Sequence, residues 1–225
     1  MNTLKEEKRQ LLSSFVYPII WLLILWAIRI VESYTHSDWG DWGIYPLTAL
    51  GLRGIIFSPL LHADFSHIFA NSVPIFVLGF LLFYFFRKIA FKVILFSWLL
   101  GGCWVWLSAR PAYHIGASGV VYSLTAFLFF IGIFKRHKGL MAVTLLVTFL
   151  YGSMIWGVVP NFFPRQQDIS WESHLMGGIA GLILAIYYRS EGPEQKIHVW
   201  EEEDDDDEGD AFYKELPPED HINLA

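Results

Sequence analysis

Long apolar stretches separated by short polar segments are the main pattern in this 225-residue sequence. A helix needs roughly 20 apolar residues to cross the hydrocarbon core of a bilayer. Six stretches approach or reach that length, namely 15–31, 68–86, 90–108, 117–134, 139–159 and 172–188. The pattern therefore predicts an all-α membrane protein, a bundle of six transmembrane helices without an internal repeat.

Polar segments bound the predicted membrane domain, which we place at residues 15–190. No small-residue cleavage site follows the first apolar stretch, so we interpret it as a retained helix rather than a signal peptide. Residues 1–14 form a short segment that we expect on the cytoplasmic side. Residues 191–225 include an acidic run from Glu201 to Asp210, and this composition predicts a solvated, disordered cytoplasmic tail.

Lysine and arginine residues concentrate in every second polar segment. Short loops rich in these residues stay in the cytoplasm, so their distribution sets the orientation of the helices. With both termini inside, the inside segments hold Lys5, Lys8, Arg9, Arg87, Lys88, Lys92, Lys135, Arg136, Lys138, Arg189, Lys196 and Lys214, and the outside connections hold only Arg53, Arg110 and Arg165. The sequence predicts an N-in/C-in, multi-pass protein of the inner cell membrane.

Composition supports this class and limits others. Charged residues make up 17% of the chain, compared with about 25% in a typical soluble domain. The net charge of −6 arises from the acidic tail, and nothing in the pattern indicates a nucleic-acid partner. The single cysteine, Cys103, excludes a disulfide within the chain and a cysteine-based metal site.

Four polar side chains lie near the starts of the second, fourth and sixth predicted helices, which all run from outside to inside. Polar groups at membrane depth are costly, so each one raises a functional hypothesis. These side chains are His67, Asn71, Ser118 and His174. Because three helices of the same direction carry them, we expect them at a similar depth below the outer surface.

The four residues supply the groups that an acyl-transfer reaction needs. Ser118 becomes a nucleophile if His174 removes its proton, and histidine has a pKa suited to that role at neutral pH. Asn71 and His67 could stabilise an oxyanion together with backbone N–H groups at the start of the fourth helix. No carboxylate is well placed to orient His174, because Glu172 is directed toward another face of its helix.

Glycines flank the same residues. Gly177 and Gly181 form a stripe of small residues after His174, and Gly116 and Gly119 surround Ser118. Such stripes allow helix backbones in a membrane to approach closely. We therefore expect the fourth and sixth helices to lie in contact, as a hydrogen bond between Ser118 and His174 requires.

Two other functions use some of the same residues. A metal site could draw on four histidines near the outer face, namely His62, His67, His114 and His174. However, the sequence lacks the His-Glu-x-x-His pair of helical zinc sites, and the prediction is that no metal is bound. A small transporter subunit is another class, but the only acidic residue within a predicted span is Glu172, the first residue of the sixth.

Three motifs resemble those of the rhomboid intramembrane serine proteases, and the match covers residues 15–190. The motifs are His67-x-x-x-Asn71, Gly116-Ala-Ser118-Gly119-Val-Val-Tyr122 and Ser173-His174-x-x-Gly177-x-x-x-Gly181. The resemblance implies a six-helix rhomboid-like bundle that needs no cofactor. It also implies that the substrates are other membrane proteins, each with a transmembrane helix that unwinds into the site.

The resemblance further implies a role for each matched position. Ser118 would be the nucleophile and His174 the general base, in a dyad without an aspartate. Asn71 and His67 would form the oxyanion hole, and Gly116 would lie in the same oxyanion or substrate-binding region. The remaining matched positions would be supporting residues: Tyr122 would pack against the His174 ring, Gly119 would flank Ser118, and Gly177 and Gly181 would let the sixth helix approach the fourth.

Two connections are also compared with the family. The loop from Pro160 to Ser170 would correspond to a mobile cap over the site. The first long connection, residues 32–66, departs from the pattern of bacterial members, which often carry a Trp-Arg pair there. In this chain Trp42 is followed by glycine, and the only arginine of the loop is Arg53. A catalytically inactive relative would lack Ser118 or His174, and this chain has both.

Overall fold

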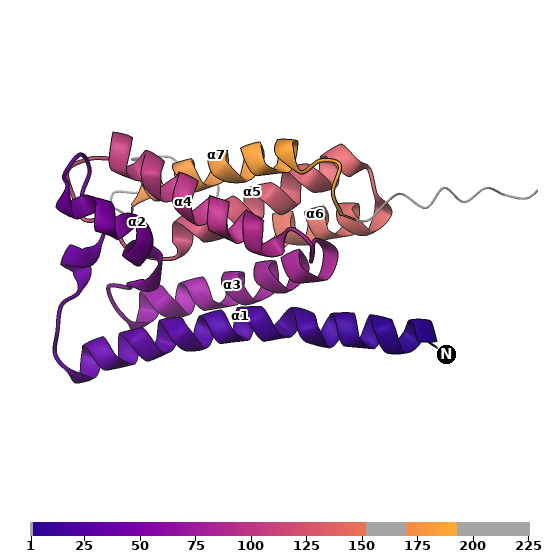
Figure 1. Cartoon of the computed structure of the whole chain (residues 1–225), viewed down its shortest axis with the longest axis horizontal. Helices are drawn as coiled ribbons and strands as arrows, with labels where there is room; N and C mark the ends of the chain where they lie inside the picture. The colour runs from indigo at the N-terminus through magenta and orange to yellow at the C-terminus, as the bar shows by residue number, and fades with distance from the viewer. Residues whose placement is uncertain (1, 152–169, 193–225) are drawn as a thin grey trace, which may run out of the picture. The chain divides into compact units, whose positions relative to one another are not determined.

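The computed structural model describes residues 2–151 and 170–192, and these residues are largely helical. The α-helices in this part of the chain are α1 (Asn2–Tyr34), α2 (Gly54–Phe57), α3 (Phe65–Phe85), α4 (Ala90–Ser108), α5 (Ser118–Lys135), α6 (Lys138–Tyr151) and α7 (Trp171–Tyr187), as labelled in Figure 1. No strand occurs among the described residues apart from one isolated antiparallel bridge between Ile44 and His114. The predicted all-α class is confirmed.

The helices follow the apolar stretches of the sequence closely. The stretch 90–108 coincides with α4, and three others agree with α3, α5 and α7 to within three residues at each end. The first helix is longer than expected, because α1 begins at Asn2 and includes the basic residues of the N-terminal segment. For the stretch 139–159, α6 is described as far as Tyr151, and the remainder lies outside the described residues.

Four of the described helices are long and apolar enough to cross a bilayer. They are Lys5–Tyr34 within α1, α3, α4 and α5. Helix α6 is shorter over its described length, and α7 has 17 residues, the lower limit for a span. The chain is therefore a multi-pass membrane protein with a helical bundle, and the count of six spans stays a prediction.

Helix α5 occupies the centre of the bundle. It contacts α3, α4, α6 and α7, and its contact with α7 is the most extensive between any two described helices. Its inward side is fully buried at Leu124, Phe127 and Ile131. Helix α1 packs mainly on α3 (Figure 1).

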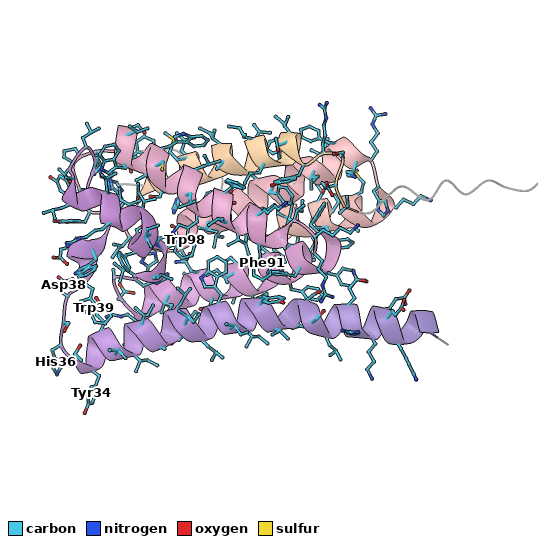
Figure 2. All side chains as sticks on the ribbon, in the orientation of Figure 1. Tyr34, His36, Asp38, Trp39, Phe91 and Trp98 are labelled. Atoms are coloured by element: carbon cyan, nitrogen blue, oxygen red, sulfur yellow. The ribbon has the colours of Figure 1, made fainter. Side chains whose placement is uncertain are left out.

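The connection between α1 and α3 is built from short helical turns rather than an open loop. It contains η1 (Gly40–Trp42), η2 (Leu50–Arg53), α2 and η3 (Ser58–Leu60). Trp98 of α4 donates from Nε1 to the carbonyl of Ile55, at 2.9 Å, which ties the connection to the bundle. Figure 2 labels Trp98 and also the turn after α1, where Trp39 donates its backbone N–H to the Glu32 carboxylate at 2.9 Å.

Candidate active site

The turn before α5 requires glycine at position 116. Gly116 has φ of +114°, a conformation that side-chain-bearing residues rarely adopt. A Cβ at this position would also lie 2.7 Å from Cε1 of the His67 ring. The Gly116 N–H donates to the carbonyl of Ser58 at 2.8 Å. Gly116 therefore brings the start of α5 directly against His67 on α3.

Ser118 is the first residue of α5 and is partly exposed. At this position a helix has no intrahelical carbonyl for its backbone N–H. The preceding N–H, of Ala117, donates to Nε2 of His62 at 3.4 Å. Burial, and to a smaller extent repulsion from the neighbouring His67, lowers the pKa of His62 to about 4. His62 is consequently neutral at pH 7 and can accept this hydrogen bond.

His174 lies in the first turn of α7 and is 7% exposed. Its Nε2 is 3.0 Å from Oγ of Ser118, which is hydrogen-bonding distance. The ring of Tyr122, one turn after Ser118, stacks on the His174 imidazole with centroids 4.1 Å apart and an interplanar angle of 7°. The ring of His174 is thus held on one face by Tyr122 and at its edge by Ser118.

Helices α5 and α7 approach each other at glycines. A Cβ at Gly177 would overlap the carbonyl oxygen of Gly119, and a Cβ at Gly181 would overlap that of Ser123. A Cβ at Gly119 would lie 3.2 Å from the carbonyl oxygen of Ser173. Any larger residue at Gly177 or Gly181 would therefore separate the two helices.

His67 and Asn71 occupy the first two turns of α3. The helix begins at Asp64, whose carboxylate accepts from the His67 N–H at 2.7 Å, an N-cap. Asn71 is 6% exposed, and its Nδ2 donates to the carbonyl of His67 at 3.1 Å. The amide has a second N–H, so one donor is not used by that bond.

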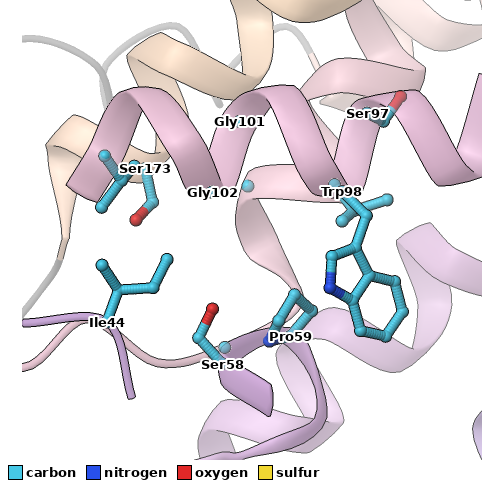
Figure 3. Close-up of a pocket in the computed structure, with 12 residues that line it drawn as sticks. Ile44, Ser58, Pro59, Ser97, Trp98, Gly101, Gly102 and Ser173 are labelled. Atoms are coloured by element: carbon cyan, nitrogen blue, oxygen red, sulfur yellow. The ribbon is translucent and has the colours of Figure 1, made fainter. Parts of the chain in front are cut away.

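A cleft of about 370 Å³ lies where α3, α5 and α7 begin, and His67, Ser118 and His174 line it together with Ala63, Arg110 and Tyr113. A second, smaller cavity of about 30 Å³ is lined by residues that include Gly116 and Gly119, and Figure 3 shows Ile44, Pro59 and Trp98 in its wall. Ser58 and Ser173 also line it, and its volume is enough for a water molecule. Ser118 and His174 thus lie in the wall of the larger cleft, and their neighbours Gly119 and Ser173 line the smaller cavity.

Most of the sequence-predicted site residues gather at the cleft, but Asn71 is not among the residues that line it. Ser118, His174, Tyr122, His67 and Gly116 are connected by the contacts above, and Asn71 lies one turn after His67. The histidines considered as metal ligands do not form a metal centre among the described residues. Among residues 2–151 and 170–192, no group of three or more His, Cys, Asp or Glu side chains has an arrangement that could hold a metal ion.

The sequence did not indicate two contacts beside the site. His114 bonds to Ser170, with Nδ1 2.6 Å from Oγ, and Arg110 forms an ion pair of 3.6 Å with Glu172. Both join the α4–α5 connection to the start of α7. The only sequence signal was the position of His114 two residues before Gly116. The cap expected from Pro160 to Ser170 and the acidic tail lie outside the described residues, except for Ser170 itself.

The first long connection contains a Trp–Arg contact that the sequence does not show. The guanidinium of Arg53 lies over the ring of Trp42, 4.6 Å from its centroid, and Nη2 of Arg53 donates to the Asp41 carbonyl at 3.0 Å. The two residues are separated in the sequence and meet because η1 and η2 fold together. The chain therefore has no adjacent Trp-Arg pair in the first long connection, but a tryptophan and an arginine are in contact there.

Comparison with known proteins gives a family for the chain. A family model of the rhomboid domain matches residues 50–191. The uncharacterized protein Rv1337 of Mycobacterium tuberculosis is 35% identical over 187 residues, which cover 80% of this chain and 77% of the relative. The uncharacterized protein ML1171 of Mycobacterium leprae is 33% identical over 190 residues, covering 82% and 74%. YdcA of Bacillus subtilis, provisionally named a rhomboid protease, is 25% identical over 185 residues, covering 76% and 88%.

Proposed function

Because the chain belongs to the rhomboid family of intramembrane proteases, we propose that it is a serine endopeptidase that cleaves transmembrane segments of other membrane proteins. In this proposal Ser118 is the nucleophile and His174 is the general base. The observation that carries the proposal is the 3.0 Å separation between Ser118 Oγ and His174 Nε2 at the edge of an open cleft.

The first step is attack of Ser118 Oγ on the scissile carbonyl. His174 Nε2 accepts the hydroxyl proton as the Oγ–C bond forms, and the carbonyl becomes a tetrahedral oxyanion. The protonated His174 then gives that proton to the leaving amine as the C–N bond breaks, which leaves an acyl-enzyme. A water molecule then gives a proton to His174 as its oxygen bonds to the acyl carbon. The Oγ–C bond breaks as His174 returns that proton to Ser118 Oγ, which frees the new carboxyl end and restores the enzyme.

The oxyanion needs donors that are already in position when its charge develops. The backbone N–H of Ser118 is one donor, and the second N–H of the Asn71 amide is another. His67 adds an imidazole on the cleft side, against Gly116. Asn71 and His67 are one turn apart on α3, so both reach the same side of the reacting carbonyl.

In this proposal the ring of Tyr122 orients the base, His174. A carboxylate normally fixes the orientation of the base in serine proteases. Here the flat stacking of Tyr122 limits rotation of the ring, and Glu172 is directed toward Arg110 instead. We propose Ser118 and His174 as the catalytic unit, whose geometry depends on the contact between α5 and α7.

The position of the site implies where it acts. We propose the N-in/C-in orientation in the inner membrane, with a membrane domain at residues 15–190 and cytoplasmic segments at residues 1–14 and 191–225. The starts of α3, α5 and α7 then lie on the outer side. The substrate is a transmembrane helix of another protein, whose unwound segment enters the cleft. No metal or cofactor is part of the reaction.

Cleavage by the protein reconstituted in liposomes, with a single-helix membrane protein as substrate, tests the proposal. Ser118→Ala removes only the nucleophile, and we expect cleavage to fall by about 10⁴-fold or more. Ser108→Ala is the matched control, because its hydroxyl bonds the carbonyl of Trp104 outside the cleft. Equal activity of the Ser118→Ala variant and the control would refute the serine mechanism.

Inhibitors separate serine chemistry from metal chemistry. An isocoumarin, which acylates serine nucleophiles, is expected to stop cleavage, and a chelator is expected to leave it unchanged. Loss of cleavage with the chelator, followed by recovery on addition of zinc, would contradict the proposal.

A further inference from the structure

The backbone of His114 is fixed within the α4–α5 connection. Its N–H donates to the carbonyl of Ile44 at 2.9 Å, and its carbonyl accepts from the Ile44 N–H at 3.0 Å. These two bonds form the isolated bridge between the connection and the loop that follows α1. The side chain is 2% exposed. His114 is thus a buried and anchored residue only four positions before Ser118.

The contacts of the His114 ring determine its tautomer. Nε2 is 3.1 Å from the carbonyl oxygen of Arg110, and because a carbonyl only accepts, Nε2 carries the hydrogen. Nδ1 of the neutral ring is then an acceptor, so the hydroxyl of Ser170, at 2.6 Å, donates to it. Burial lowers the pKa of His114 below the usual value of 6.5, which favours the neutral ring at pH 7.

Ser170 connects the His114 ring to the first turn of α7 through hydrogen bonds. As the N-cap of the helix, its Oγ accepts from the Ser173 N–H at 3.3 Å. The two hydroxyls of Ser170 and Ser173 are 2.7 Å apart, and since the proton of Ser170 is directed to His114, Ser173 is the donor. The carbonyl of Ser170 also accepts the backbone N–H of His174 at 3.4 Å. A directional chain of hydrogen bonds therefore connects His114 to the turn that carries His174.

A second contact joins the same two segments. Nη1 of Arg110 is 3.6 Å from Oε1 of Glu172, and the Glu172 side chain is 6% exposed. Its Oε2 is buried without a hydrogen-bond partner among the described residues. At 3.6 Å the ion pair is longer than a hydrogen bond, so the contact of 2.6 Å between His114 and Ser170 is the more directional constraint.

We propose that His114 is a positioning residue, which acts through Ser170 to hold the first turn of α7 so that His174 stays within hydrogen-bonding distance of Ser118. The role rests on the proposed function and extends it to the α4–α5 connection. The ring of His114 lines the cleft and bonds to Ser170 Oγ and to the Arg110 carbonyl. Its effect is on the geometry of the dyad, and the rate of reaction at Ser118 is the quantity that should change.

Three substitutions at one position separate positioning from simple stabilisation. His114→Ala removes the acceptor for Ser170. His114→Asn places a carbonyl oxygen close to the position of Nδ1 and so restores that acceptor, whereas His114→Gln places its amide close to the position of Nε2. His36→Ala is the control, because His36 lies in an exposed turn after α1.

For each variant of the full chain in liposomes, we would measure kcat and KM for cleavage and the rate constant for labelling of Ser118 by a fluorophosphonate. His114→Ala is expected to lower both kcat and the labelling rate by about 10- to 100-fold, as a displacement of catalytic groups by about 1 Å does, with KM nearly unchanged. His114→Asn should recover most of both rates and His114→Gln should not. In a Ser170→Ala background His114→Ala should add little, because both residues act in one chain.

Different results would overturn the two proposals separately. Failure of wild-type Ser118 to be labelled, with cleavage intact, would refute the serine mechanism and the positioning role with it. Normal labelling of both the wild type and His114→Ala would refute the positioning role alone. Equal loss in the Asn and Gln variants, in proportion to a lower melting temperature, would also refute it, because His114 would then only stabilise the fold. The Asn–Gln comparison decides the matter even if His114→Ala does not fold.

Discussion

Two helix pairs in this protein pack in opposite ways. Between α5 and α7, backbone lies against backbone, because Gly177 and Gly181 face the carbonyls of Gly119 and Ser123. Between α1 and α3, aromatic rings fill the space, as in the stack of Phe15 on Phe80 with centroids 4.3 Å apart. The interface between α5 and α7 contains Ser118 and His174, and the interface between α1 and α3 contains neither of these two residues.

The difference shows what each interface can tolerate. Large side chains can adopt new rotamers when a neighbour changes, so an interface of rings repacks at a moderate cost. Two backbones in contact have no such freedom, and any added atom moves a whole helix. A Ser–His distance of 3.0 Å depends on helix positions rather than on rotamers alone. A glycine interface is therefore suited to a site of fixed geometry.

The largest expected effect in this comparison comes from His174→Ala, at the glycine interface. The variant loses the base that removes the Ser118 proton, and kcat should fall by about 10⁴-fold or more. The matched loss at the ring interface is Trp26→Phe, which removes the indole donor to Ser72 Oγ at 3.0 Å. That variant should cleave at nearly the wild-type rate. Similar losses in both variants, measured as kcat in liposomes, would remove the distinction between the interfaces.

Neighbouring residues on α3 provide the next contrast, because they face the two different regions. The side chain of Asn71 donates to the carbonyl of His67, whereas Ser72 Oγ accepts from the indole of Trp26 on α1. Asn71→Ala removes one proposed oxyanion donor and should lower kcat by about 10²- to 10³-fold, while slow labelling of Ser118 persists. Ser72→Ala should leave kcat nearly unchanged. If kcat of Asn71→Ala equalled that of Ser72→Ala, Asn71 would have a structural role only.

Adjacent glycines on α7 test the backbone contact itself. A Cβ at Gly177 overlaps Gly119, whereas a Cβ at Gly178 meets nothing within 4 Å. Gly177→Ala should displace His174 from Ser118 and lower kcat about 10- to 100-fold. Gly178→Ala should keep full activity and stabilise the helix, because alanine is the better helix former by about 1 kcal/mol. Equal rates of cleavage for both variants would contradict close packing of α5 and α7.

The smallest effect on activity is expected at the ring interface. Phe80→Leu removes the nearer of the two rings that stack on Phe15 while keeping an apolar side chain, and we expect a loss of about 1 kcal/mol in stability. The melting temperature should fall by a few degrees, with kcat at the same temperature nearly unchanged. A loss of activity greater than that of Gly177→Ala would show that α1 and α3 influence the site directly.

Much of the fold could be predicted, because apolar length is a strong constraint in a membrane. The stretch 90–108 matches α4, since the charged residues Lys88 and Arg110 lie just beyond its two ends. The approach of Ser118 and His174 could also be predicted, from the common direction of their helices and from the stripe of Gly177 and Gly181. These inferences need only helix periodicity and orientation, which the sequence contains.

Other features depend on tertiary structure and could not be predicted. The extent of α1 was underestimated, because an apolar criterion stops at the membrane boundary although Lys8 and Arg9 are good helix formers. Contacts between connections were missed as well. His114 and Ser170 are 56 positions apart, and the path that brings them together is set by how the helices pack, which no local pattern records.

The central claim is that Ser118, activated by His174, is the reacting residue. Its most direct test is to treat the reconstituted protein with a fluorophosphonate and locate the adduct by mass spectrometry of its peptides. The adduct should lie on Ser118 in the wild type, and it should be absent from both Ser118→Ala and His174→Ala. An adduct on another residue, or labelling of Ser118 that is unchanged in His174→Ala, would contradict the account.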